Sequence, residues 1–212
     1  MRRIGDQNKG VSGSMKRILW FAALAFCLSV PSLVLAQEGT EYNHAEVGAF
    51  VDYENFARTS PHINFLGLGG RAAFNAGRYA QIEAEMNYDF KRNFTNEISN
   101  GISTTFVTTR LRPLHAMFGP KFNTTVGGAR AFFTFKVGFV NFSATNQNAP
   151  AGFTTAVGGI TTGNTRPAIY PGVGLEGFWG PFGLRFDVGD DIYFDNGARN
   201  NLKMSFGPAI RF

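Results

Sequence analysis

Cysteine is nearly absent from this sequence, which contains a single one, Cys27. That residue lies in an N-terminal segment that we expect to be removed on export, so the mature chain has no thiol. A chain without thiols forms no disulfide, offers no thiolate nucleophile and holds no metal through cysteine. All three kinds of site are therefore excluded from the mature protein.

Long apolar runs are also missing, apart from a short one near the N-terminus. Lys16 and Arg17 precede the apolar residues 18–30, and small residues lead up to Ala36. This order is typical of a secretory signal peptide with cleavage after Ala36. The run is shorter than the roughly 20 residues of a transmembrane helix. We predict that residues 1–36 are an upstream extension plus a cleaved signal peptide.

Net charge is small once this leader is set aside. The whole chain has 20 basic and 15 acidic side chains, and residues 1–36 hold five of the basic and one of the acidic ones. The mature chain therefore has 15 basic and 14 acidic side chains, a net charge of +1. The basic character that would indicate a nucleic-acid partner leaves with the leader. We expect no such partner.

Helical periodicity is absent too: no stretch of the sequence repeats apolar residues at positions i, i+3, i+4 and i+7. Apolar and polar residues alternate instead, as they do in half-buried strands. In residues 79–91 the even positions are apolar or aromatic, whereas Glu83, Glu85 and Asp89 stand at odd positions. The same alternation runs through residues 130–139, 183–188 and 202–212.

These patterns predict strands near residues 46–56, 63–75, 79–91, 104–122, 130–143, 166–178, 183–195 and 202–212. The strands are long, and aromatic residues stand near their ends, as in the girdles of a transmembrane barrel. Connections are tight after the even-numbered strands, and the longest ones, residues 92–103 and 144–165, follow odd-numbered strands. We predict an all-β protein, an eight-stranded antiparallel up-and-down transmembrane β-barrel over residues 46–212. Residues 37–45 would be a short periplasmic segment.

The chain ends inside an alternating strand, where Phe206, Ile210 and Phe212 belong to the apolar set. In a closed barrel the last strand pairs with the first, because lipid offers no partner to a free backbone edge. A final strand that runs to the last residue is therefore expected of this fold.

The segments "EVGAFVDYENF", "LGLGGRAAFN", "AMFGPKF", "PGVGLEG" and "MSFGPAIRF" resemble the OmpA-like or OmpX-like outer-membrane β-barrel domains of Gram-negative bacteria. The resemblance implies a monomer in the bacterial outer membrane, in contact with the lipid bilayer and lipopolysaccharide. It also implies that outer-membrane assembly machinery recognises Phe206, Ile210 and Phe212. Larger members continue into a peptidoglycan-binding domain. Because this sequence ends at Phe212, we expect no role in cell-wall anchoring.

Motifs for catalysis or cofactor binding are weak. Residues 172–177 fit the spacing of a dinucleotide-binding loop, but no helix follows to hold a pyrophosphate. The glycines there are expected at positions where a bulky neighbour needs room. The three histidines are His44, which precedes the first expected strand, His62, in an expected loop, and His115. His115 has no serine two residues away on its own face, and a serine on a neighbouring strand is left open. We expect no catalytic, cofactor-binding or metal residues, His115 as a polar filler, and Asp191 on an outer rim.

If the apolar face meets lipid, the polar face lines the lumen. The charged side chains expected there are Asp52, Glu54, Arg71, Glu83, Glu85, Arg110, Arg112, Arg130, Lys136, Glu176, Arg185, Asp187, Lys203 and Arg211. Ten of them form the predicted charge network: Arg71, Glu83, Glu85, Arg110, Lys136, Glu176, Arg185, Asp187, Lys203 and Arg211. Buried charges must pair or be hydrated, and eight strands leave a lumen only wide enough for side chains. We predict a plugged polar lumen.

The leading functional interpretation is a structural or surface-binding protein whose loops, residues 92–103 and 144–165, contact an extracellular ligand that the sequence does not name. The alternatives are a narrow porin-like channel and, with less support, a lipid-modifying outer-membrane enzyme. Conductance separates the first two interpretations. A change in lipid A would identify the third.

Overall fold

The computed structural model describes residues 44–57, 59, 62–99, 104–125, 128–149, 157, 160 and 165–212. The chain divides into one unit of residues 1–38 and another of residues 39–212, and the described residues all belong to the second. The predicted signal peptide and nearly all of segment 37–45 lie outside this range. Within it, no helix is long and apolar enough to cross a membrane.

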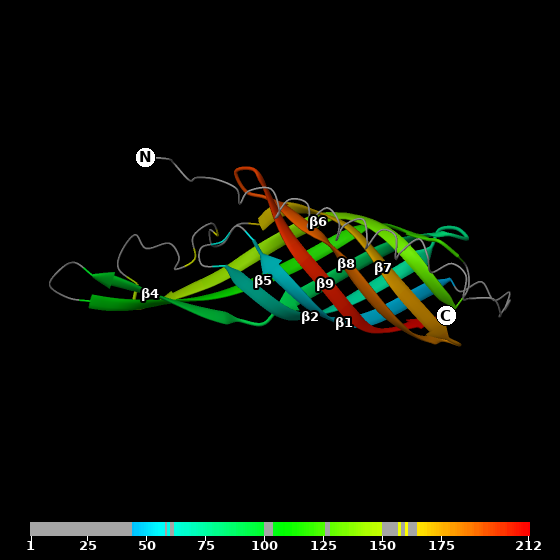
Figure 1. Ribbon diagram of the computed structural model, residues 1–212, viewed down its shortest axis with the longest axis horizontal. Coiled ribbons are helices and arrows are strands. Elements are labelled where there is room, and N and C mark those ends of the chain that lie inside the picture. Colours follow the sequence, from blue (N-terminus) through cyan, green and yellow to red (C-terminus); the bar gives the residue numbers. More distant parts are fainter. Residues whose placement is uncertain are drawn as a thin grey trace, which may run out of the picture. The chain divides into compact units, whose positions relative to one another are not determined.

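The described residues form one antiparallel sheet that closes on itself (Figure 1). Its strands are β1 (Ala45–Phe56), β2 (Ile63–Asn75), β3 (Ala80–Asp89), β4 (Arg92–Ser99), β5 (Thr104–Asn123), β6 (Ala129–Gln147), β7 (Thr165–Trp179), β8 (Phe182–Phe194) and β9 (Ala198–Arg211). Neighbouring strands pair in the order β3-β2-β1-β9-β8-β7-β6-β5-β4, and β3 also pairs with β5, which closes the sheet. The predicted antiparallel up-and-down barrel is confirmed.

Strands β3 and β4 occupy one position in the barrel, which therefore has eight strand positions. Both strands pair with β5. Strand β4 pairs with residues 104–111 of β5, and β3 pairs with residues 114–122. Between them the chain breaks pairing at Phe90 and Lys91. Pro113 of β5 faces this break, where a residue without an N–H group costs no ladder hydrogen bond.

Residues 92–103 were expected to form a loop, and this expectation is wrong for most of them. Residues 92–99 are β4, which continues the line of β3 and forms a hairpin with β5 beyond the end of β2 (Figure 1). On its other side β5 pairs with β6 from Thr108 onward, where Thr108 is opposite Gln147, the last residue of β6. The second expected loop, residues 144–165, contributes residues 144–147 to β6 and lies mostly outside the described residues after residue 149.

The barrel has two distinct ends. At the turn end, tight connections join β2 to β3, β5 to β6 and β7 to β8, and both the first and last strand meet there. The N–H groups of His44 and Ala45 donate to the carbonyl oxygen of Phe212 at 2.9 Å. At the extension end, the hairpin of β4 and β5 projects beyond the rest of the strands. Closure thus extends through the last residue of the sequence.

Large apolar side chains cover the outside of the barrel. Those exposed on this face include Val47, Val51, Leu66, Leu68, Phe74, Ile82, Met86, Phe118, Phe133, Val137, Val173, Leu175, Leu184, Phe186, Leu202, Phe206 and Ile210. Toward the extension end polar residues join the outward set, and Phe106 and Phe194 are exposed there as well. Asn55 contacts Asn64 there, and Asn200 donates to Asp190 at 2.6 Å. An apolar belt bounded by polar residues is the exterior that a lipid bilayer requires.

Candidate functional site: the charged lumen

Strand pleating positions the lumen side chains, because alternate residues point to opposite faces of a sheet. Along β1 the inward residues run from Glu46 at the turn end through Asp52 and Glu54 to Phe56 at the extension end, and all four are buried. The lumen therefore changes along the axis from charged to apolar. Four groups of described side chains point into it.

The turn-end cluster consists of Glu46, Lys121, Arg130 and Glu176. The Lys121 ammonium lies 2.7 Å from Glu176 Oε2 and 3.5 Å from Glu46 Oε1. Arg130 reaches the same two carboxylates, with Nη2 3.0 Å from Glu46 Oε2 and Nε donating to Glu176. Two cations and two anions bridge β1, β5, β6 and β7, so the cluster is balanced in charge.

The central cluster consists of Arg71, Glu83, Glu85, Lys136, Arg185 and Asp187. Lys136 Nζ lies 2.6 Å from Glu83 Oε1 and 2.5 Å from Glu85 Oε2. Arg185 donates both terminal nitrogens to Glu83, and its Nε donates to Asp187 Oδ2 at 3.1 Å. Arg71 Nη1 donates to the same Asp187 oxygen at 2.6 Å. Three cations therefore face three carboxylates.

Neutral side chains complete the hydrogen bonding of this cluster. The hydroxyl groups of Tyr170 and Ser205 donate to Asp187 Oδ1 at 3.1 and 3.0 Å. Arg71 Nη2 in turn donates to the Ser205 hydroxyl oxygen at 2.7 Å. Further along the lumen, Lys203 donates to Asn87 at 2.7 Å and lies 3.6 Å from Glu85 Oε1. Asn87 Nδ2 donates a hydrogen bond to Asp52 Oδ2 at 3.0 Å.

The histidine cluster consists of Glu54, Asp89, His115 and Asp191, from β1, β3, β5 and β8. His115 Nε2 lies 3.0 Å from Glu54 Oε2 and 3.5 Å from Asp89 Oδ2. Its other ring nitrogen, Nδ1, lies 2.9 Å from Asp191 Oδ2. All four residues have 0% of their surface exposed. His115 is thus the centre of a carboxylate cluster and not an isolated polar filler, and Asp191 is inside the lumen and not on an outer rim.

An apolar cap lies beyond the histidine cluster at the extension end. It consists of Phe56, Ile63, Phe65, Leu111, Val140, Phe142, Val157, Ile160, Ala168 and Tyr193, with Phe94 and Ala144 packed against it. Met117 belongs to the same apolar cluster but lies on the turn-end side of His115 along β5. Phe56 and Phe65 meet edge-to-face with ring centroids 5.5 Å apart, and Phe142 meets Tyr193 at 5.3 Å. Such pairs are packed aromatic contacts of the kind found in protein cores.

Nine of the ten residues of the predicted network lie on the inward face. Arg71, Glu83, Glu85, Lys136, Arg185, Asp187 and Lys203 are linked to one another, and Glu176 belongs to the turn-end cluster. Arg211 stands apart at the turn end, where its Nε donates to the Gly180 carbonyl at 3.0 Å and its guanidinium lies over Phe178.

The placement of Arg110 in this network is wrong. Arg110 is exposed on the outside of β5, and Arg112 also lies on that face, with its guanidinium 3.9 Å from the centre of the Tyr88 ring. The inward residues of this segment are Val107, Leu111 and Pro113. Near the extension end the usual pattern is inverted, because the lumen is apolar there and the outside has left the apolar belt.

Sequence reasoning missed Glu46, Lys121, Asp89 and the role of His115. Strand parity, which placed the other charges inward, was available for Asp89 and Lys121 as well. Asp89 has the parity of Glu83 and Glu85 on one strand, and Lys121 has the parity of His115 on another. Parity places these side chains on the inward face, whereas their partners depend on register between strands. The alternation of apolar and polar residues specifies the face that a residue takes. Which inward side chains meet depends in addition on how strands far apart in the sequence are aligned around the barrel.

Glycines make room for large lumen rings, as expected from the segment 172–177. A Cβ atom on Gly174 would lie 2.3 Å from the Phe132 ring, and one on Gly172 would lie 2.6 Å from the Tyr170 ring. Both distances are far inside van der Waals contact. These glycines are therefore packing positions and not part of a phosphate-binding loop.

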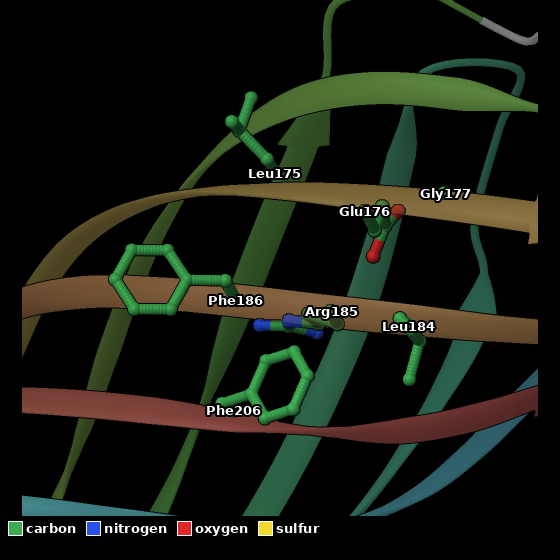
Figure 2. A pocket seen from close by; sticks show the side chains of 7 residues that line it. All are labelled: Leu175, Glu176, Gly177, Leu184, Arg185, Phe186 and Phe206. Atoms are coloured by element: carbon green, nitrogen blue, oxygen red, sulfur yellow. The ribbon is translucent and has the colours of Figure 1, made fainter.

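A shallow depression of about 260 Å³ lies on the outside of the barrel. Figure 2 shows its apolar lining, with Leu175, Leu184, Phe186 and Phe206 spread over β7, β8 and β9. It forms where Gly177 leaves an outward position without a side chain. Because its open side lies within the apolar belt, acyl chains of the bilayer would fill it.

Comparisons with known proteins give matches in structure alone. No protein-family model matches the sequence, and no curated protein matches it. Among solved structures, Neisserial surface protein A is similar, with a TM-score of 0.52 and 10% identity over 79% of this chain and 97% of that one. At this identity the likeness shows the fold.

Two further structures match with lower scores. The N-terminal β-barrel domain of Pseudomonas aeruginosa OprF has a TM-score of 0.45 and 14% identity, over 80% of this chain and 98% of that one. Ail, the attachment invasion locus protein of Yersinia pestis, has been solved in complex with a heparin analogue. Its TM-score is 0.44 and its sequence identity 13%, over 80% of this chain and 99% of that one. The closed strands and apolar belt identify this chain as an outer-membrane β-barrel protein.

Proposed function

We propose that this protein is a plugged outer-membrane barrel with a structural or surface-binding role, performed through its extension end. The observation that carries the proposal is the filling of the lumen. The charged clusters occupy it from Glu46 onward, and the apolar cap follows them at the far end. Because small outer-membrane barrels have short periplasmic turns, the turn end faces the periplasm and the extension end faces the exterior.

Charge pairing supports a plug over an open channel. The carboxylates of Glu83 and Asp187 each contact two cationic side chains, so they have partners without a column of water. An ion entering the lumen would have to separate these pairs, and breaking a buried pair costs about 3–5 kcal/mol. The apolar cap adds a second barrier at the exterior end. A narrow porin-like channel is therefore the less favoured proposal.

The hairpin of β4 and β5 is the surface that we propose for binding. Its β4 residues Asn93, Thr95, Asn96 and Glu97 are exposed, and β4 pairs only with β5 among the described strands. A two-stranded ribbon with polar side chains offers hydrogen bonds to a ligand or to lipopolysaccharide. The partner is left open, and nucleic acid is not among those proposed.

We also propose that the protein is not an enzyme. His115, the histidine inside the barrel, contacts carboxylates and lies among residues with no exposed surface. A hydrolytic site on lipid would need a nucleophile that opens toward the apolar belt. Expression in a host with defined lipid A should therefore leave the mass of lipid A unchanged.

The last strand is proposed as the assembly signal, read by outer-membrane assembly machinery. Phe206, Ile210 and Phe212 are exposed on the outside of the barrel, where such machinery would reach them. Deletion of Phe212 should reduce the amount of folded protein in the outer membrane strongly. Deletion of Ala151, in a connection between strands, is the matched control and should reduce it little.

Binding by the hairpin can be tested on intact cells. We would replace residues 93–107 by a short turn and compare wild-type and shortened barrels for binding to lipopolysaccharides and to matrix proteins. A control insertion at Asn196, in the tight β8–β9 connection, should leave binding unchanged. Equal binding by cells with the wild-type and the shortened barrel would contradict the proposal, provided that both barrels fold and reach the surface.

A further inference from the structure

Three side chains of the histidine cluster bring potential metal ligands together. One ligand atom from each of Glu54, Asp89 and His115 lies within 4.8 Å of the others. The three residues come from β1, β3 and β5, so the sheet's closure and not one local motif assembles them. Each belongs to a rigid strand, which fixes its approach to the shared point.

The distances suit a small metal ion. In a tetrahedral zinc site with bonds of about 2.0–2.1 Å, neighbouring ligand atoms are about 3.3 Å apart. His115 Nε2 lies 3.0 Å from Glu54 Oε2 and 3.5 Å from Asp89 Oδ2, on either side of that value. The Glu54 and Asp89 oxygens lie within 4.8 Å of each other, so an ion between the three atoms would draw these two carboxylates together.

The oxygens that face this point accept no hydrogen bond from the described residues. Both carboxylate oxygens of Glu54 and both of Asp89 are fully buried without a hydrogen-bond donor in suitable geometry. Buried polar atoms in folded proteins are nearly always satisfied, so such a group requires an explanation. A bound cation would satisfy the oxygens of both residues.

Asp191 completes an arrangement typical of metal-bound histidines. Its Oδ2 lies 2.9 Å from His115 Nδ1, the ring nitrogen that faces away from Glu54 and Asp89. Metal-ligating histidines commonly give this second N–H to a carboxylate, which fixes the ring and its tautomer. The two atoms are close but not in hydrogen-bond geometry in the described structure. A small rotation of the ring would let Nδ1–H donate to Asp191 and would direct the Nε2 lone pair to the proposed ligand position.

The charge of this part of the lumen also favours a cation. Asp52, Glu54, Asp89 and Asp191 are buried here, with the His115 ring and the Lys203 ammonium as the neighbouring basic groups. In the central cluster, by contrast, three carboxylates meet three cationic side chains. A divalent ion would offset the excess of carboxylates among these described residues.

We propose that Glu54, Asp89 and His115 bind a divalent transition-metal ion inside the barrel, with Asp191 as a positioning residue for His115. The donor set is one imidazole nitrogen with carboxylate oxygens and no thiolate. Imidazole suits zinc, copper, iron and nickel, whereas calcium and magnesium prefer oxygen donors alone. Zinc is the probe of choice because its four-coordinate sites use these ligands.

The position of the site determines how it would be loaded. The apolar cap lies on one side, and Lys203 with the central cluster lies on the other. A metal ion would enter as the strands close and would exchange slowly afterwards. This site therefore ties β1, β3, β5 and β8 together from within.

The test is to refold the full chain in detergent with zinc chloride, pass it over a chelating resin, and measure zinc by mass spectrometry. We expect about one zinc per folded chain. Asp89→Asn and His115→Gln should each retain less than a tenth of it. Asp191→Asn should weaken zinc binding about 10–100-fold and shift the visible absorption of the cobalt-loaded protein. His62→Gln and Glu46→Gln are controls and should bind zinc like the wild type.

Folding of every variant is checked by its anomalous migration on unboiled gels, so that loss of zinc is separated from loss of the barrel. Wild-type protein without stoichiometric zinc or cobalt after refolding would overturn the proposal. Folded Asp89→Asn or His115→Gln protein that binds zinc like the wild type would overturn it too, since the metal would then sit elsewhere. An Asp191→Asn variant with an unchanged cobalt spectrum would remove the positioning role.

Discussion

Glu83 is the most informative place to test the charged lumen. It is fully buried, lies 2.6 Å from Lys136 Nζ, and accepts two hydrogen bonds from Arg185. Glu83→Gln keeps the volume and removes the charge. Lys136 would keep Glu85 at 2.5 Å and Arg185 would keep Asp187 at 3.1 Å. We therefore expect a loss of about 3 kcal/mol in unfolding free energy, the lower end of the range for a broken buried pair.

A double variant measures the interaction between Glu83 and Arg185. Arg185→Met alone should cost a similar amount, because it leaves Glu83 and Asp187 with one cation fewer each. In Glu83→Gln/Arg185→Met both members of the pair are gone, and the loss should be smaller than the sum by about 1–3 kcal/mol. The assay is urea unfolding of the refolded barrel in lipid vesicles, followed by the fluorescence of Trp179.

A partly exposed ion pair supplies the matched control. Arg166 Nη2 lies 3.3 Å from Asp195 Oδ1 at the extension end, where both side chains are in part open to solvent. Asp195→Asn should cost no more than about 1 kcal/mol, because pairs that solvent reaches contribute little. If Glu83→Gln costs as little as this control, or if the double variant is additive, the lumen charges are solvated and the reasoning is refuted.

Three further changes test the exterior and the packing. Phe206→Arg, within the apolar belt, should destabilise the inserted barrel by about 2–4 kcal/mol, and Ile210→Arg, nearer the turn end, by less; equal losses in vesicle unfolding would contradict the belt. Arg110→Ala should change the unfolding free energy by less than about 0.5 kcal/mol in the same assay, because the side chain is exposed. A large loss would show that the Arg110 side chain lies inside the lumen. Gly174→Val should prevent native packing against Phe132, seen as loss of the folded band on unboiled gels, and normal folding would show that the ring can move.

Alternation within strands predicted the barrel because each strand that crosses lipid must be apolar on one face. The expected strand at residues 63–75 has the bounds of β2, and the others differ by a few residues at their ends. The prediction failed at β4, where the sequence "RNFTNEIS" is mostly polar. This strand lies beyond the apolar belt and needs no lipid-facing side, so the signal that revealed the other strands is absent.

The sequence predicts which charged side chains face the lumen, but not which of them contact one another. Glu83, Lys136 and Arg185 could be placed inward from parity, while their meeting at one point depends on strands far apart in sequence. The same limit hid the histidine cluster, because Glu54, His115 and Asp191 each look ordinary on their own strands. Arg110 was misplaced because the rule of apolar outside and polar inside reverses at the extension end.

The central claim is that the lumen is plugged by its charged clusters and apolar cap. Its most direct test is the conductance of the purified wild-type barrel in a planar lipid bilayer, with Phe56→Gly/Phe142→Gly as a variant that opens the cap. The account predicts no stable single-channel steps for the wild type. Stable, ion-selective steps in the wild type, with a selectivity that Glu83→Gln changes while stability is unaffected, would show an open aqueous pathway and contradict it.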